Sequence, residues 1–183
     1  PVRARPLGPV VRTPTRASAV GRWQDRAVPI TESVASDDAR IPPLMRAYWT
    51  EMAHRYGETD GATPLIPLHG QARWLLVHSD EGALLGCGAV QPLTSTLEGA
   101  PSDLGEVKRV YVVPEARGHG HARLLMAHLV QVARSAGYRA LWLDTGTPQP
   151  EAVALYERLG WRQIERYGQF AHDERTLCYA FDL

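Results

Sequence analysis

Two glycines stand close together in the stretch RGHGHARLLM, residues 117–126, where a run of apolar residues at helical spacing begins. Glycine lowers helix stability, so a pair at a helix start needs a reason. The first amides of a helix lack intrahelical partners, and the helix dipole adds positive potential there. Small residues at Gly118, Gly120 and Ala122 would let an anion approach the backbone. The glycines alone leave open whether this is an ordinary loop or an anion site.

His119 and His121 flank the second glycine and raise the question of a metal site. A metal site usually takes three or four protein ligands, and no cysteine or carboxylate cluster accompanies these two histidines. We therefore expect no metal.

The two cysteines, Cys87 and Cys178, lie in apolar, strand-like runs. They predict no disulfide framework and fit a reducing compartment, so we expect a cytoplasmic protein.

The bulk composition is that of an ordinary globular domain, with 44% hydrophobic and 22% charged residues. The formal net charge is zero. Dedicated nucleic-acid and membrane-surface binders usually carry an excess of positive charge. No stretch has the length and apolar character of a transmembrane helix or a signal-peptide core. We expect no nucleic-acid or membrane partner, and a monomer or homodimer.

The N-terminal residues differ from the rest of the chain. Residues 1–24 are rich in arginine and proline and contain no acidic residue. Prolines disfavour an amphipathic helix, so we expect residues 1–25 to form a flexible tail. Residues 26–183 are long enough for one domain with a real core. A nucleic-acid-binding role for the tail is an alternative that rests on these residues alone.

Apolar periodicity, with glycine and proline at the boundaries, predicts the order of elements. Strands are expected over residues 27–33, 72–79, 83–93, 105–113, 139–145, 161–170 and 176–183. Helices are expected over residues 37–57, from 118–120 to 136, and over 148–160 with Thr147 as the N-cap. The central strand–helix–strand unit implies a parallel pair, and the flanking hairpins imply antiparallel neighbours. The prediction is an α/β (α+β) domain with a mixed sheet and helices packed on its faces.

Several stretches together resemble the GNAT superfamily of N-acetyltransferases. RGHGHA matches the form Gln/Arg-x-x-Gly-x-Gly/Ala of that family's pyrophosphate loop. EVKRVYVVPEARGHGHARLLM is similar to its fourth strand, loop and next helix, and RALWLDTG and EAVALYERLGWRQI to its fifth strand and following helix. The clear similarity covers residues 104–166. It implies a GNAT-like, mostly antiparallel sheet with a splayed parallel pair of central strands, helices on both faces, and acetyl-CoA as co-substrate.

The resemblance also implies which residues hold acetyl-CoA. The pantetheine arm would pair with the backbone of residues 110–112 like an added strand, and the pyrophosphate would lie on the amides of residues 118–122. Many GNAT chains carry an asparagine after the fifth strand, which is missing here, so Thr145 or Gln149 could take its place. The two arginines at the loop can contact phosphate or solvent. The expected cofactor-binding residues are Val110, Tyr111, Val112, Arg117, Gly118, His119, Gly120, His121, Ala122, Arg123, Thr145 and Gln149.

Tyr156 and Glu106 are the expected catalytic residues. Tyr156, in ALYERLG, holds the position of the GNAT tyrosine near the thioester sulfur, where it would act as the acid. Its helical face is apolar, so a plain core residue is the alternative. Glu106 matches a strand-four glutamate that serves some GNAT enzymes as a base, directly or through water; the alternative is a solvated strand charge. Strand alternation would place it on the face of Lys108, Val110 and Val112, and the amide of Val110 is the expected oxyanion donor.

The expected function is acetyl transfer from acetyl-CoA to a primary amine of a small molecule, by direct attack in a ternary complex. The alternatives are a non-catalytic acyl-CoA-binding regulatory module and a protein-lysine or N-terminal acetyltransferase. In the GNAT fold, acceptor specificity comes mainly from the first helix and the final hairpin. The candidate acceptor residues there are Tyr48, Trp49, Glu51, His54, Tyr56, Tyr167, Phe170 and His172.

Overall fold

The computed structural model describes residues 29–57, 68 and 70–183. The tail expected over residues 1–25 lies outside the described residues, as does most of the loop after the first helix. The strands are β1 (Ile30–Val34), β2 (Arg73–His78), β3 (Leu84–Pro92), β4 (Leu104–Val112), β5 (Ala140–Gly146), β6 (Arg162–Ile164) and β7 (Thr176–Asp182). The helices are α1 (Ile41–Tyr56), α2 (His121–Ser135) and α3 (Pro150–Arg158), with short 3-10 turns η2 (Leu93–Ser95), η3 (Pro114–Ala116) and η4 (Gly168–Phe170).

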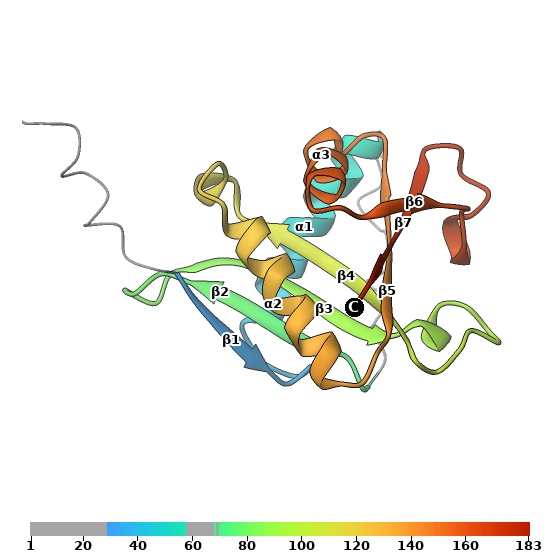
Figure 1. The fold of residues 1–183 in the computed structure, drawn as a ribbon. Helices are drawn as coiled ribbons and strands as arrows, with labels where there is room; N and C mark the ends of the chain where they lie inside the picture. Colours follow the sequence, from blue (N-terminus) through green and yellow to red (C-terminus); the bar gives the residue numbers. More distant parts are fainter. Residues whose placement is uncertain (1–28, 58–67, 69) are drawn as a thin grey trace, which may run out of the picture.

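The strands form one seven-stranded sheet in the order β1-β2-β3-β4-β5-β7-β6. The central β4–β5 pair is parallel and the other neighbours are antiparallel. Helix α2 covers one face of the sheet and α1 covers the other, while α3 packs beside β5 (Figure 1). These features confirm the expected fold: a mixed, mostly antiparallel sheet with a parallel central pair and helices on both faces.

The core on the α2 face is built from the apolar side of that helix. Leu125 and Leu129 are fully buried against the sheet, and Met126 is 1% exposed. Burying a side chain of this size contributes about 1.5–3 kcal/mol. On the opposite face, Leu44 and Met45 of α1 pack on β2, β3 and β4. Because two separate cores hold the sheet from both sides, β4 is fixed between them.

Several expected boundaries are wrong. The first helix, expected from residue 37, begins at Ile41. The strand expected over residues 161–170 is short, because only Arg162–Ile164 pair with β7 and the chain then turns Tyr167 into the interior. The N-cap of α3 is Gln149 and not Thr147, because Pro150 takes the first helical position.

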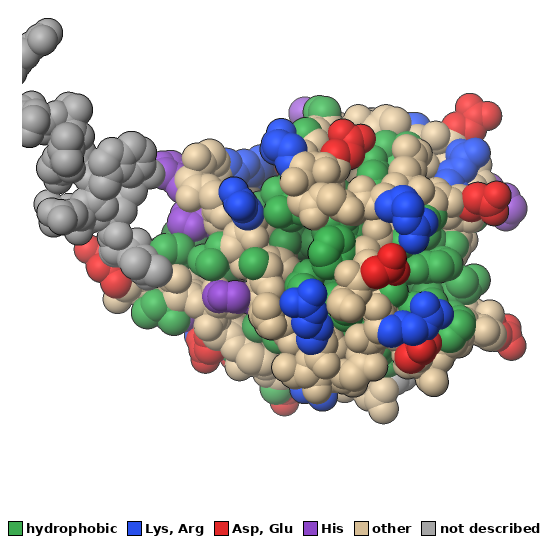
Figure 2. Space-filling model, viewed as in Figure 1, with side chains coloured by type: hydrophobic (Ala, Val, Ile, Leu, Met, Phe, Trp, Pro, Cys, Tyr) green, Lys and Arg blue, Asp and Glu red, His purple; other side chains and the backbone are tan. Residues whose placement is uncertain are grey.

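No helix in the described ranges has the length and apolar character needed to span a membrane. Figure 2 shows cationic and acidic side chains interspersed on the face turned to the viewer, as the zero net charge of the sequence leads one to expect.

Candidate active site

A cleft opens where β4 and β5 separate. Their parallel pairing runs only from Leu104↔Ala140 to Glu106↔Trp142, and Figure 1 shows the two ribbons diverging beyond that point. The cleft has a volume of about 450 Å³ and is lined by both strands, by α1 and by the segment that leads into β7. The splay expected from the resemblance is therefore present, and it leaves the β5-facing edge of β4 without a paired strand beyond Glu106 in the described structure.

A β-bulge in β4 shapes one wall of this cleft. Cys87 pairs with Tyr111 and Ala89 with Lys108, so two residues of β4 stand opposite Gly88. Arg109, one of these two, has a φ of 58°. The bulge brings the consecutive residues 107–110 all to the cleft lining.

The bulge also overturns the expected strand alternation. Glu106 and Lys108 share a face, since the ammonium of Lys108 lies 3.2 Å from the Glu106 carboxylate. Val110 instead packs against the apolar cluster under α2, together with Val107. The prediction that Glu106 and Val110 face the same way is wrong, because the extra residue shifts the side-chain period after Lys108.

Glu106 is fully buried behind the cleft wall. Its Oε1 accepts a hydrogen bond from the hydroxyl of Tyr167 at 3.0 Å and lies 3.2 Å from the ammonium of Lys108. Its Oε2 accepts hydrogen bonds from Gln91, at 2.9 Å, and from Thr96. Both donors to Oε2 line the cleft, although Glu106 itself does not. The hydroxyl of Thr96 therefore connects the cleft lining to the carboxylate of Glu106.

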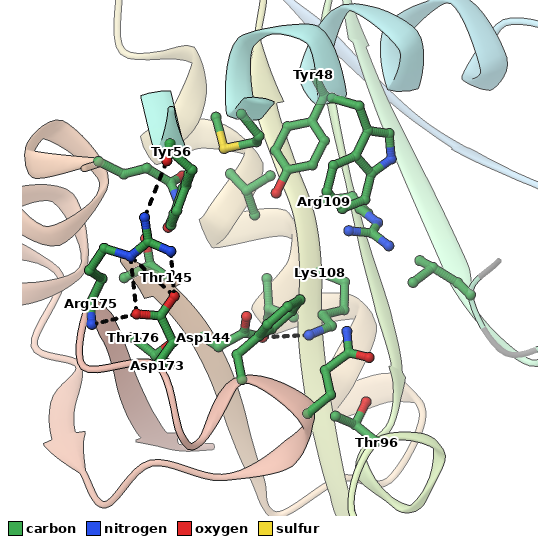
Figure 3. A pocket seen from close by; sticks show the side chains of 18 of the residues that line it. Tyr48, Tyr56, Thr96, Lys108, Arg109, Asp144, Thr145, Asp173, Arg175 and Thr176 are labelled. Atoms are coloured by element: carbon green, nitrogen blue, oxygen red, sulfur yellow. Dashed lines mark hydrogen bonds and ion pairs between the residues drawn. The ribbon is translucent and has the colours of Figure 1, made fainter. Parts of the chain in front are cut away.

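Lys108 carries its charge between two carboxylates. Its Nζ pairs with Asp144 of β5 across the opening between the strands (Figure 3). The same Nζ lies 3.2 Å from Glu106 on its own strand. Burial disfavours the charged ammonium, but the two carboxylates outweigh burial and raise the pKa of Lys108. We did not predict Lys108 and Asp144 as site residues. The available signal was that Lys108 is the only lysine of the chain.

Tyr156 lies on α3 with its side chain in the cleft lining, and it is 6% exposed. Its ring packs against Trp161 and Tyr179, with centroids 6.0 and 6.1 Å apart. Burial raises the pKa of its hydroxyl, so the group stays protonated at neutral pH. The ring of Tyr156 is therefore part of the core, and the residue also lines the cleft. Both the core position and the cleft position considered in the sequence analysis apply to it.

The glycine turn opens α2 as expected. Gly118 and Gly120 have φ values of 78° and 86°, which residues with a Cβ rarely adopt. An added Cβ at either glycine would meet no atom within 4 Å, so the space over the turn is open. Gly120 is the N-cap, and α2 has no side-chain cap and no acidic residue in its first turn. These amides are suited to an anion.

The side chains around the turn divide into two groups. His119 is exposed, and its ring stacks with that of His121 at a centroid distance of 6.0 Å. Arg123 is exposed and Ala122 half-buried on the first turn of α2. Arg117 turns back instead, donating to the carbonyl of Val112 at 3.0 Å and pairing with Glu51 of α1 at 2.5 Å.

Within the described ranges, no group of three His, Cys, Asp or Glu residues could hold a metal ion.

The two residues expected in place of the missing asparagine behave differently. Thr145 is 8% exposed and lines the cleft, and its Oγ1 is buried with no hydrogen-bond partner among the described residues. Gln149 also lines the cleft, but its amide donates to the hydroxyl of Tyr56 at 3.1 Å. An unpaired buried hydroxyl is costly, so Thr145 is the better candidate to meet a bound molecule.

Half of the expected acceptor residues line the cleft. Tyr48, Trp49 and Tyr56 do so from α1, and Phe170 from the segment before β7. The other four are not part of the lining: Glu51, His54, Tyr167 and His172. Five charged lining residues were not predicted: Lys108, Arg109, Asp144, Asp173 and Arg175.

Residues 41–161 match the family model described as the Acetyltransferase (GNAT) family. The chain belongs to the GNAT family of acetyltransferases. It is 36% identical over 96 residues to an uncharacterized N-acetyltransferase of Escherichia coli, covering 52% of this chain and 54% of that protein. It is 38% identical over 102 residues to an IAA acetyltransferase of Azospirillum brasilense, covering 56% and 63%.

An amino-acid acetyltransferase of Mycobacterium tuberculosis is 30% identical over 114 residues, covering 62% of this chain and 59% of that protein. The chain thus spans between about half and two thirds of the length of these curated relatives. Among solved structures, a proposed acyl-CoA N-acyltransferase of Klebsiella pneumoniae superimposes with a TM-score of 0.68 and 27% identity, covering 86% of this chain and 99% of that one. Nearly the whole Klebsiella chain therefore shares its fold with the present GNAT chain.

Proposed function

We propose that this GNAT chain is an N-acetyltransferase that moves an acetyl group from acetyl-CoA to a primary amine of a small molecule. The observation that carries the proposal is the cleft between the diverging strands β4 and β5, with a protonated tyrosine in its lining. The names of two relatives, an IAA acetyltransferase and an amino-acid acetyltransferase, favour a small acceptor.

The described residues fit acetyl-CoA along the cleft. The free edge of β4 at residues 110–112 offers backbone groups for the pantetheine arm, although the carbonyl of Val112 already accepts from Arg117. Thr145 lines the same space, and its buried hydroxyl has no hydrogen-bond partner among the described residues. The amides of residues 118–122 would hold the pyrophosphate. When bound, acetyl-CoA supplies an acetyl group in a thioester that an amine can attack.

Tyr156 would act as the general acid. Its hydroxyl keeps a proton in the cleft because burial raises its pKa. That proton goes to the departing sulfur, and the tyrosine regains one from the acetylated nitrogen through water in the cleft.

Glu106 would act as the general base through a relay. An acceptor ammonium gives its proton to Thr96 Oγ1, and the hydroxyl proton of Thr96 passes to Glu106 Oε2. The relay is needed because Glu106 is fully buried and does not line the cleft. Lys108, beside Oε1, stabilises the carboxylate before it takes up the proton.

The amide of Val110 would stabilise the developing oxyanion. Val110 lies in the bulge, where the register assigns it no partner on β3, and it lines the cleft. A preorganised backbone donor of this kind typically contributes about a hundredfold or more to kcat. Attack would take place with acetyl-CoA and the amine bound together, because both must reach the same cleft.

The test measures loss of thioester from acetyl-CoA with a panel of amines that includes amino acids, polyamines and a lysine peptide. CoA alone should raise the melting temperature by mass action. Turnover with a small amine supports the proposal. A melting shift without turnover by any amine would point to an acyl-CoA-binding module, and turnover of the peptide alone to a protein acetyltransferase.

A further inference from the structure

Arg109 holds an unusual backbone conformation at the centre of the cleft wall. It is the one non-glycine residue with positive φ among the described residues, at 58°. Bulky side chains rarely adopt this conformation, and such strain gathers at functional sites. A glycine here would be free of the strain, so the position keeps an arginine in spite of it.

The bulge places the side chains of Lys108 and Arg109 in the cleft together, where a regular strand would turn one of them away. Figure 3 shows Lys108 directed to Asp144 and Arg109 directed to α1. The guanidinium carbon of Arg109 lies 4.3 Å from the ring centroid of Trp49 and 5.9 Å from that of Tyr48. A guanidinium stacked on an aromatic face can still present its N–H edge to a planar, two-oxygen anion.

Most charges of the cleft wall are paired with one another. Lys108, Arg109 and Arg175 supply three positive charges, and Asp144 and Asp173 supply two negative ones. Lys108 is balanced by Asp144, and Arg175 pairs with Asp173 at 2.8 Å. Glu106, behind the wall, lies 3.2 Å from Lys108 and adds a third negative charge, so the charges of the wall sum to zero. An anion is favoured here by the guanidinium of Arg109 in the lining and not by a net positive charge.

We propose that Arg109 binds a carboxylate of the acceptor, so that the acceptor is an amino-carboxylate of the α-amino-acid class. This inference rests on the proposed acetyltransferase function and names the substrate class of its cleft. The carboxylate lies toward Trp49 and Tyr48, and the amine lies toward the thioester and Tyr156. Arg109 is thus a specificity-determining residue on the acceptor side.

The test compares the standard L-amino acids with their α-carboxamides as acceptors, following thioester loss by its ultraviolet absorbance. We expect the wild-type kcat/KM for the preferred amino acid to exceed that for its amide at least thirtyfold. Arg109→Gln should lower kcat/KM for the acid about 30- to 100-fold and change that for the amide less than threefold, because only the acid loses a charge-assisted pair. Arg109→Lys keeps the charge without the planar fork, so its kcat/KM for the acid should lie between those of the wild type and of Arg109→Gln.

Arg139→Gln is the matched control, since Arg139 pairs with Asp103 on the surface and is 60% exposed in its side chain. It should leave both activities unchanged. The melting shift with CoA shows that each variant is folded with its cofactor site intact. Equal wild-type activity on acids and amides, an equal loss of both in Arg109→Gln, or no turnover of any amino acid would overturn the inference. Turnover of amines without a carboxylate would then leave the acetyltransferase proposal standing, whereas no thioester loss with any amine would end both.

Discussion

Replacing Tyr156 by phenylalanine removes one hydroxyl and little else. The ring contacts with Trp161 and Tyr179 remain available to phenylalanine. No hydrogen bond of the Tyr156 hydroxyl is found among the described residues, so we expect the free energy of unfolding to change by less than about 0.5 kcal/mol. If the hydroxyl protonates the leaving sulfur, kcat should fall about a hundredfold, equivalent to about 2.7 kcal/mol of activation free energy.

The assay is steady-state thioester loss with a saturating acceptor, together with thermal unfolding. The Kd for CoA should stay within about threefold of wild type, because the lost group acts on the departing sulfur and not on binding of the nucleotide. Tyr179→Phe is the matched control. It removes a hydroxyl that lies 3.5 Å from Glu157 Oε1 and outside the cleft lining, so its kcat should match wild type.

The pH profile gives a second readout for Tyr156. Burial raises its pKa, so the protonated acid persists to higher pH than an exposed tyrosine, whose pKa is about 10. Wild-type kcat should therefore show no decline from tyrosine ionisation as the pH rises through 10. A Tyr156→Phe enzyme that keeps a third or more of wild-type kcat would refute the assignment of the acid.

Three further results are expected. Glu106→Gln removes a buried carboxylate that accepts hydrogen bonds from three side chains and pairs with a lysine. It should lower the free energy of unfolding by about 2–4 kcal/mol and lower kcat at least tenfold. A stable, fully active variant would contradict the relay. Glu51→Gln releases Arg117 from its carboxylate and should lower the Kd for CoA about threefold at low salt, measured by calorimetry, whereas no change would place Arg117 away from the phosphates. Burial raises the pKa of the Cys87 thiol to about 12 and also raises that of Cys178, so the native protein should not react with a thiol reagent until it is denatured; rapid labelling of folded protein would contradict this burial.

The fold and the glycine turn before α2 could be predicted because their signals are local. The glycines at 118 and 120 and the apolar stripe of α2 are close in sequence, and the structure shows positive φ and buried leucines where they indicate them. The same holds for the end of α1, where Gly57 adopts the left-handed conformation of a C-cap.

The charged lining of the cleft could not be predicted because it depends on how distant strands meet. The bulge at Arg109 arises from the register of β4 against β3, which no pattern within β4 alone specifies. Lys108 and Asp144 stand 36 residues apart and become partners only across the opening between their strands. The same applies to Arg117 and Glu51, 66 residues apart, which join the glycine turn to α1.

A crystal structure of the chain with CoA tests the central claim most directly. The account predicts the pantetheine arm between β4 and β5 along residues 110–112, with the pyrophosphate hydrogen-bonded to the amides of residues 118–122 and the sulfur beside the hydroxyl of Tyr156. CoA bound elsewhere, or a nucleotide that leaves these amides unoccupied, would contradict it.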